Sequence, residues 1–211
     1  MVIGFVPGGG GMSRKQMSPA EKAYFEKLIV DGVLEPIDGR KLEAENGIVG
    51  LFCSDPYRRE DVIGHKERIL LEIFGHKLIF PIMFPGGALR LGVESPANIR
   101  GSSLHADMLT GIQTGLRVLE TTTVALYIHF PCAHAGLCGL DPYTCMRTLF
   151  RAKHYVKRKT TLPPSADGTP TKLRVPCFIH LDWGNGRMET YFIRGTNFNI
   201  WNHIPEVIRQ A

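Results

Sequence analysis

The chain has 211 residues, of which 44% are hydrophobic and 21% charged, a composition typical of a globular protein with one sizeable α/β domain. It lacks the run of about 18 apolar residues that a membrane-spanning helix needs and the charged-then-apolar order of a secretory signal, so we expect a cytoplasmic protein without membrane contact. The net charge of +5 includes a basic run at 151–159, which we interpret as the solvated face of a helix rather than a nucleic-acid site.

The N-terminal region is expected to be an extension of the main domain. Residues 1–18 are rich in glycine but lack the Lys-Ser or Lys-Thr pair that closes a phosphate-binding loop, so we expect a flexible arm. A helix then begins behind Ser18, which can form a capping box with Glu21. We therefore predict a helical extension over 19–45 as part of a single domain that covers 19–211.

Strands and helices alternate along the rest of the chain. The apolar run at 46–55 is typical of a strand buried on both faces, and helical periodicity follows it up to Gly75. The later segments are an extended segment at 76–92, a helix at 103–120, a strand at 121–130, a helix from Asp141, a loop at 160–172 and a hairpin at 173–195 around Asn185-Gly186. This order predicts an α/β fold with a central, mostly parallel β-sheet flanked by helices and a C-terminal hairpin.

The five cysteines are expected to be reduced, because an odd number in a chain without a secretory signal does not suit a disulfide framework. Cys145 and Cys177 fall on a predicted helix and strand, where burial is the simple explanation. Cys53 instead ends a predicted strand, and His134 and Cys138 follow another strand in a glycine-containing loop. Since functional groups collect beyond the carboxyl ends of parallel strands, these three side chains can come together.

Thiolate and imidazole are the ligands that zinc prefers. Three protein ligands leave a fourth position for water, which is the arrangement of catalytic rather than structural zinc sites. The alternative is that Cys53 fills the core and that His134 is structural.

Two segments resemble the β class of carbonic anhydrases. They are GLFCSDPYR at 50–58 and VALYIHFPCAHAGLCG at 124–139. That family has a Cys-x-Asp-x-Arg segment after its first core strand and a His-x-x-Cys-Gly segment after a later strand that a long helix precedes. The closing hairpin also resembles the last core strand and turn of the family, so the likeness extends in outline over 45–195.

The resemblance implies a role for each matching residue. Cys53, His134 and Cys138 would be the ligands of a Zn²⁺ ion. Asp55 would lie beside the metal and orient the bound water, and Arg58 would hold Asp55 as its ion-pair partner. A guanidinium in this position keeps a carboxylate ionised.

Two of these assignments have competitors. The first motif reads Cys-x-Asp-x-x-Arg, so Arg59 competes with Arg58. The second reads His-x-x-x-Cys-Gly, one residue longer than in the family, and Cys132 can replace Cys138 as a ligand. We interpret His129 as a structural residue of the strand.

The resemblance implies a zinc lyase that hydrates carbon dioxide to bicarbonate. A related hydrolase of carbon disulfide or carbonyl sulfide would share the same metal site, and a non-catalytic relative would fill the fourth zinc position with Asp55. Members of the family associate, so a homodimer or larger homo-oligomer is expected, with the helix at 19–31 reaching across the partner.

Overall fold

The computed structural model describes residues 16–37, 44–55, 59–76, 78–98, 103–164 and 168–198. Their helices and strands are, in order, α1 Pro19–Val30, β1 Leu34–Pro36, β2 Ile48–Cys53, α2 Arg59–Phe74, β3 Ile79–Phe84, the 3-10 helix η2 Gly87–Arg90, α3 Leu104–Val118, β4 Val124–Phe130, α4 Ala133–Leu137, α5 Pro142–Lys159, β5 Cys177–Gly184 and β6 Arg187–Ile193. Among the helices described, none combines the length and the apolar character needed to span a bilayer.

The strands of the described part form one six-stranded mixed sheet in the order β1-β6-β5-β4-β2-β3. The pairs β3–β2, β2–β4 and β4–β5 are parallel, whereas β6 runs antiparallel to both β5 and β1. The α/β class is therefore confirmed, but the sheet is less parallel than the sequence predicted. The predicted C-terminal hairpin supplies one antiparallel pair, and the unpredicted strand β1 adds a second by continuing the sheet beyond it.

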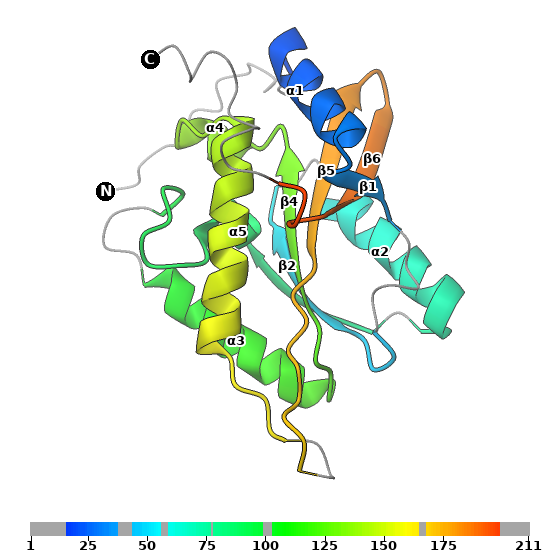
Figure 1. The fold of residues 1–211 in the computed structure, drawn as a ribbon, viewed down its shortest axis with the longest axis vertical. Helices are drawn as coiled ribbons and strands as arrows, with labels where there is room; N and C mark the ends of the chain where they lie inside the picture. Colours follow the sequence, from blue (N-terminus) through cyan, green and yellow to red (C-terminus); the bar gives the residue numbers. More distant parts are fainter. Residues whose placement is uncertain are drawn as a thin grey trace, which may run out of the picture.

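Helices cover both faces of the sheet (Figure 1). On one face α1, α3 and α5 enclose a large apolar cluster, to which β2 contributes Val49 and Leu51. On the other face α2 places Leu70 in a smaller cluster with Ile48 and Phe52 of the same strand. The alternation along β2 is that of a strand buried on both sides, as its nearly continuous apolar sequence predicted.

A row of aromatic rings crosses the sheet on the α2 side. The ring centroids of Phe52 and Tyr127 lie 4.8 Å apart, those of Tyr127 and Phe178 also 4.8 Å, and Phe192 meets Phe178 edge-on at 5.8 Å. Because side chains on one face of a strand repeat every two residues, the next position on this face of β4 is His129. The row thus lies on the α2 face of β2, β4, β5 and β6.

Local sequence signals place several boundaries correctly. Ser18 and Glu21 form the capping box of α1, with Ser18 N donating to Glu21 Oε2 at 2.7 Å and Glu21 N donating to Ser18 Oγ at 3.2 Å. The hairpin between β5 and β6 turns at Asn185 and Gly186, whose φ angles are 53° and 78°. The predicted loop that carries His134, in contrast, contains the short helix α4. Residues 1–15 of the predicted arm lie outside the described residues.

Candidate metal centre

Three ligand-bearing side chains meet at the carboxyl ends of β2 and β4. Cys53 is the last residue of β2, His129 is the penultimate residue of β4, and Cys132 follows two residues after that strand. One ligand atom from each lies within 4.8 Å of the other two. The residues are almost fully buried, with relative exposures of 8%, 4% and 3%. Within the described residues, this group can hold a metal ion.

The spacing of the two sulfur atoms matches a shared zinc ion. Cys53 Sγ and Cys132 Sγ lie 3.9 Å apart. Two thiolates bound to one tetrahedral zinc at about 2.3 Å each have their sulfur atoms about 3.8 Å apart. The pair therefore needs almost no rearrangement to bind a metal of this kind.

His129 uses one ring nitrogen in a hydrogen bond and leaves the other without one. Its Nδ1 lies 3.0 Å from the carbonyl oxygen of Pro131, which can only accept, so Nδ1 carries the proton. Nε2 is buried and has no hydrogen-bond partner among the described residues. A buried polar atom without a partner is costly, and metal-binding histidines commonly show this pattern of one bonded and one coordinating nitrogen.

The two thiols are electrostatically unequal. The backbone N–H of Gly86 donates to Cys53 Sγ at 3.2 Å. The hydrogen bond from the Cys132 thiol lowers the pKa of Cys53 against the opposing effect of burial, and His129 and the Gly86 amide add to the lowering. The same thiol pairing, together with burial, raises the pKa of Cys132. The metal-free pair thus favours one thiolate and one thiol, so binding zinc through both would release a proton.

The turn before η2 brings backbone directly against this cluster, and only glycine fits there. Gly86 and Gly87 have φ angles of 84° and 50°. A Cβ at Gly86 would lie 2.4 Å from His134 Cδ2, and one at Gly87 would lie 2.6 Å from the backbone nitrogen of Cys53. The Pro-Gly-Gly turn therefore allows the amide of Gly86 to reach the sulfur of Cys53.

Asp55 lies beside the three ligands. Its Oδ2 is 3.8 Å from His129 Nε2, and its side chain is only 10% exposed. It is not among the three residues whose ligand atoms all lie close together. The predicted partner Arg58 lies outside the described residues, and the same holds for the side chain of Arg59 at the start of α2. The ion pair between Asp55 and either arginine stays a prediction.

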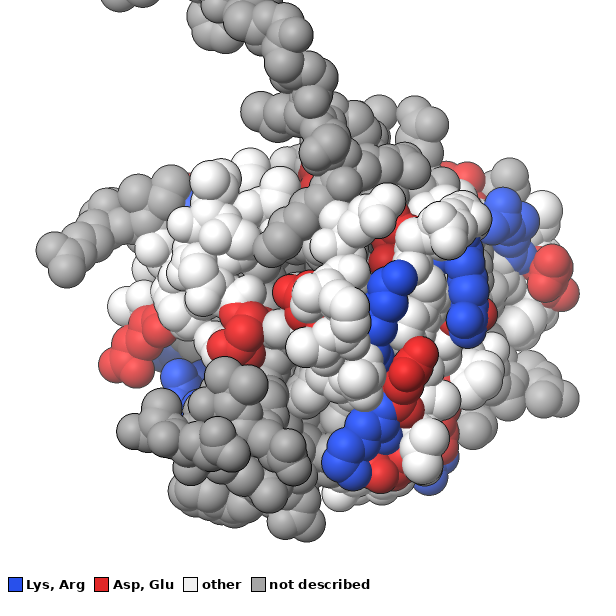
Figure 2. Space-filling view, turned by 90° about the horizontal axis from the view of Figure 1, so that it is seen from above, with Lys and Arg blue, Asp and Glu red and all other residues white. Residues whose placement is uncertain are grey.

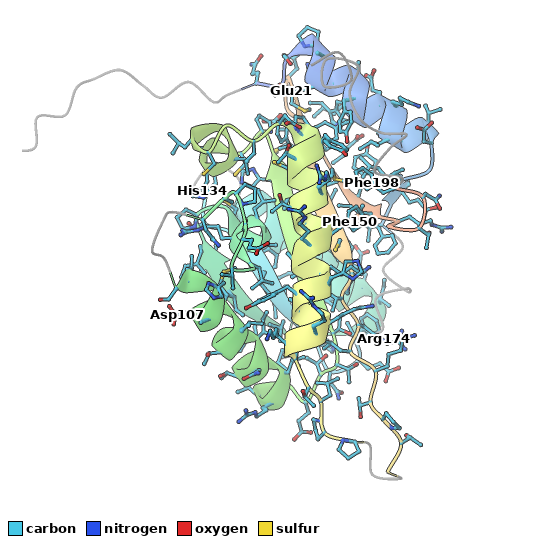
Figure 3. The ribbon with its side chains drawn as sticks, turned by 60° about the vertical axis from the view of Figure 1, so that its left-hand side comes forward. Glu21, Asp107, His134, Phe150, Arg174 and Phe198 are labelled. Carbon is cyan, nitrogen blue, oxygen red and sulfur yellow. The ribbon has the colours of Figure 1, made fainter. Side chains whose placement is uncertain are left out.

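The predicted ligands His134 and Cys138 lie next to each other at α4. Cys138 Sγ is 3.7 Å from His134 Nε2, which in turn lies 2.9 Å from the carbonyl oxygen of Ala97. Figure 3 shows His134 beside α5, on the side opposite Phe150. Since the carbonyl oxygen accepts, His134 Nε2 is the donor in this contact. The combination of His134 and Cys138 with Cys53 stays a prediction, whereas the structure brings His129 and Cys132 to Cys53.

A spacing signal for the observed cluster was present in the sequence. His129-Phe130-Pro131-Cys132 reads His-x-x-Cys, the spacing of the family motif that the resemblance invoked. The glycine after Cys138 favours the longer His134-to-Cys138 segment, and the apolar strand around His129 favours a structural role for that histidine.

Figure 2 looks down on the upper end of the molecule as drawn in Figure 1, where α1 and α4 lie, and shows Lys and Arg side chains interspersed with Asp and Glu.

Comparison with models of known protein families gives no match, and neither curated protein sequences nor solved structures match this chain significantly.

Proposed function

We propose that this protein is a zinc enzyme that hydrates carbon dioxide to bicarbonate, with Cys53, His129 and Cys132 as the metal ligands. The observation that carries the proposal is the buried Cys-His-Cys cluster, in which the sulfur spacing suits zinc and one buried imidazole nitrogen has no hydrogen-bond partner among the described residues. The resemblance of the Cys53 segment to the β-class carbonic anhydrases supports the choice of reaction.

Zinc held by three protein ligands supplies a strong nucleophile at neutral pH, because it lowers the pKa of a bound water from near 16 to about 7. The residues of the chain orient the metal ligands and the water. The Pro131 carbonyl orients the imidazole of His129, and the Gly86 amide stabilises the thiolate of Cys53. The Asp55 carboxylate would accept a hydrogen bond from the attacking water and fix its direction. Burial of the cluster limits access to small neutral substrates.

A non-catalytic zinc protein is the second candidate, and the position of Asp55 favours it. Its Oδ2 lies 3.8 Å from His129 Nε2, so a modest movement would make the carboxylate a fourth ligand. Four protein ligands close a zinc site and leave no position for water.

Zinc content and stopped-flow carbon dioxide hydration test these functions on the purified full chain. We expect about one zinc per chain in the wild type and loss of both zinc and activity in Cys53→Ser and His129→Ala. Asp55→Asn should keep the metal and lose most of the activity. His134→Ala is the matched control for His129→Ala and should keep the zinc.

Two results would contradict the proposal in different ways. Zinc retained by His129→Ala but lost by His134→Ala would show that the ligand set is wrong. One zinc per chain without hydration activity from about pH 6 to 9 would exclude the carbon dioxide reaction, and hydrolysis of carbon disulfide or carbonyl sulfide would then distinguish a related hydrolase from a structural site.

A further inference from the structure

A cavity lies between the segment that follows η2 and helix α5. Residues 91–96 and one side of α5 enclose a cavity of about 530 Å³. Cavities of roughly 300–1,000 Å³ are typical of sites for metabolite-sized ligands. None of the candidate metal ligands lines this cavity.

The helical wall of the cavity is a regular stripe on α5. Thr148, Arg151, Tyr155 and Arg158 follow one another at intervals of three, four and three residues, which places them on one face of the helix. Arg151 and Arg158 are exposed, whereas Thr148 is buried at its end of the stripe. The edge-to-face contact of Tyr155 with His105 of α3, at 6.3 Å between ring centroids, holds the phenol in place.

The opposite wall is held by its own hydrogen bonds. Asn98 Nδ2 donates to the carbonyl of Gly92 at 2.7 Å, Ala97 N donates to Ser95 Oγ at 3.2 Å, and Ser95 Oγ donates to the carbonyl of Leu89. These bonds fold residues 89–98 onto themselves. The wall is therefore formed before any ligand arrives, and a preformed wall lowers the cost of binding.

The charges that line the cavity favour an anion. Arg151 and Arg158 contribute two positive charges and Glu94 one negative charge. Neither guanidinium has a hydrogen bond or ion pair with any residue that the structure describes. Arginine presents a planar fork of donors that suits phosphate, so two unpaired arginines on one wall form a suitable anion-binding surface.

The distance between the arginines sets the size of the ligand. Seven residues along a helix correspond to about 10 Å, which is more than one phosphate group can bridge. Tyr155 lies between them on the same stripe. We propose that this cavity binds a phosphorylated metabolite of nucleotide size, with its phosphate on one arginine and its body along Tyr155 toward the other. This site goes beyond the proposed function and does not depend on zinc.

Isothermal titration of the full chain with AMP tests the proposal. We expect saturable binding by the wild type, equal with and without zinc, and weaker binding of inorganic phosphate. The double variant Arg151→Gln/Arg158→Gln should lose affinity for AMP by about 100-fold, because each charge-assisted contact contributes about 1.4 kcal/mol or more.

The control is Arg147→Gln/Lys157→Gln, which removes the same charge from the same helix at positions that do not line the cavity. It should bind AMP nearly as well as the wild type. An equal loss in both double variants would overturn the site, because it would show non-specific attraction. Absence of saturable AMP binding, or equal affinities for AMP and inorganic phosphate, would overturn the ligand class.

Discussion

Replacing Cys132 by serine tests which sulfur atoms hold the metal. The substitution nearly preserves volume but removes a thiolate that lies 3.9 Å from Cys53 Sγ, where about 3.8 Å is expected for a shared zinc. Four-ligand zinc sites bind with about 10–16 kcal/mol, or about 3–4 kcal/mol per ligand. We therefore expect the zinc dissociation constant of Cys132→Ser to rise by about 100- to 1,000-fold.

Cys138→Ser is the matched control, because Cys138 Sγ lies against His134 Nε2 at 3.7 Å. Its zinc dissociation constant should stay within about three-fold of the wild type, a change of less than 1 kcal/mol. The measurement is competition with a chromophoric zinc chelator, and circular dichroism of the metal-free variants establishes that both fold. A large loss of affinity in Cys138→Ser, with none in Cys132→Ser, would refute the assignment.

Two further predictions concern the packing and the redox chemistry of the same region. Gly115→Ala should lower the free energy of unfolding by about 1–2 kcal/mol in urea titrations, because its Cβ would lie 2.6 Å from a ring carbon of Phe80 and overpacking outweighs the helical gain. Gly111→Ala, whose nearest contact at 3.2 Å is the flexible end of an isoleucine, should be neutral or slightly stabilising, and the reverse order would contradict the packing argument. Hydrogen peroxide should oxidise the metal-free protein to a disulfide between Cys53 and Cys132. A thiol titration should then count two fewer free thiols per chain, and dithiothreitol should restore both. An equal loss of thiols in Cys53→Ser would show that other cysteines react.

The elements of the fold were predictable where the signal is local. The capping box of Ser18 and the Asn185-Gly186 turn act within a few residues, so sequence alone places them. Strand β1 escaped prediction because three residues carry too little periodicity, and it exists only through its pairing with β6. Strand order likewise depends on contacts between distant segments, which local propensity does not encode.

The sequence predicted cysteine and histidine ligands at this edge of the sheet, and the set Cys53, His134 and Cys138 stays a prediction beside the observed group of Cys53, His129 and Cys132. Functional groups collect at the carboxyl ends of parallel strands, which predicts that Cys53 meets groups near the end of β4. The structure has a cysteine and histidine cluster there. The position of His129 depends on the register of β4. It is the penultimate residue of this strand and lies on the same face as Tyr127. An apolar neighbourhood argued for a core histidine, yet the same burial is what makes an unpartnered imidazole nitrogen a good metal ligand.

The separation of the two cysteines along the chain links metal binding to folding. Cys53 ends β2 and Cys132 lies two residues beyond the neighbouring parallel strand β4, so the two cysteines are 79 positions apart along the chain. An ion bound to both would close a long loop in the chain, so the zinc-bound form requires β2 and β4 to be correctly paired. The apparent stability would then follow the free zinc concentration, by about 4 kcal/mol at one thousand times the dissociation constant. Zinc supply during synthesis would thereby control how much of the chain reaches and keeps its native topology.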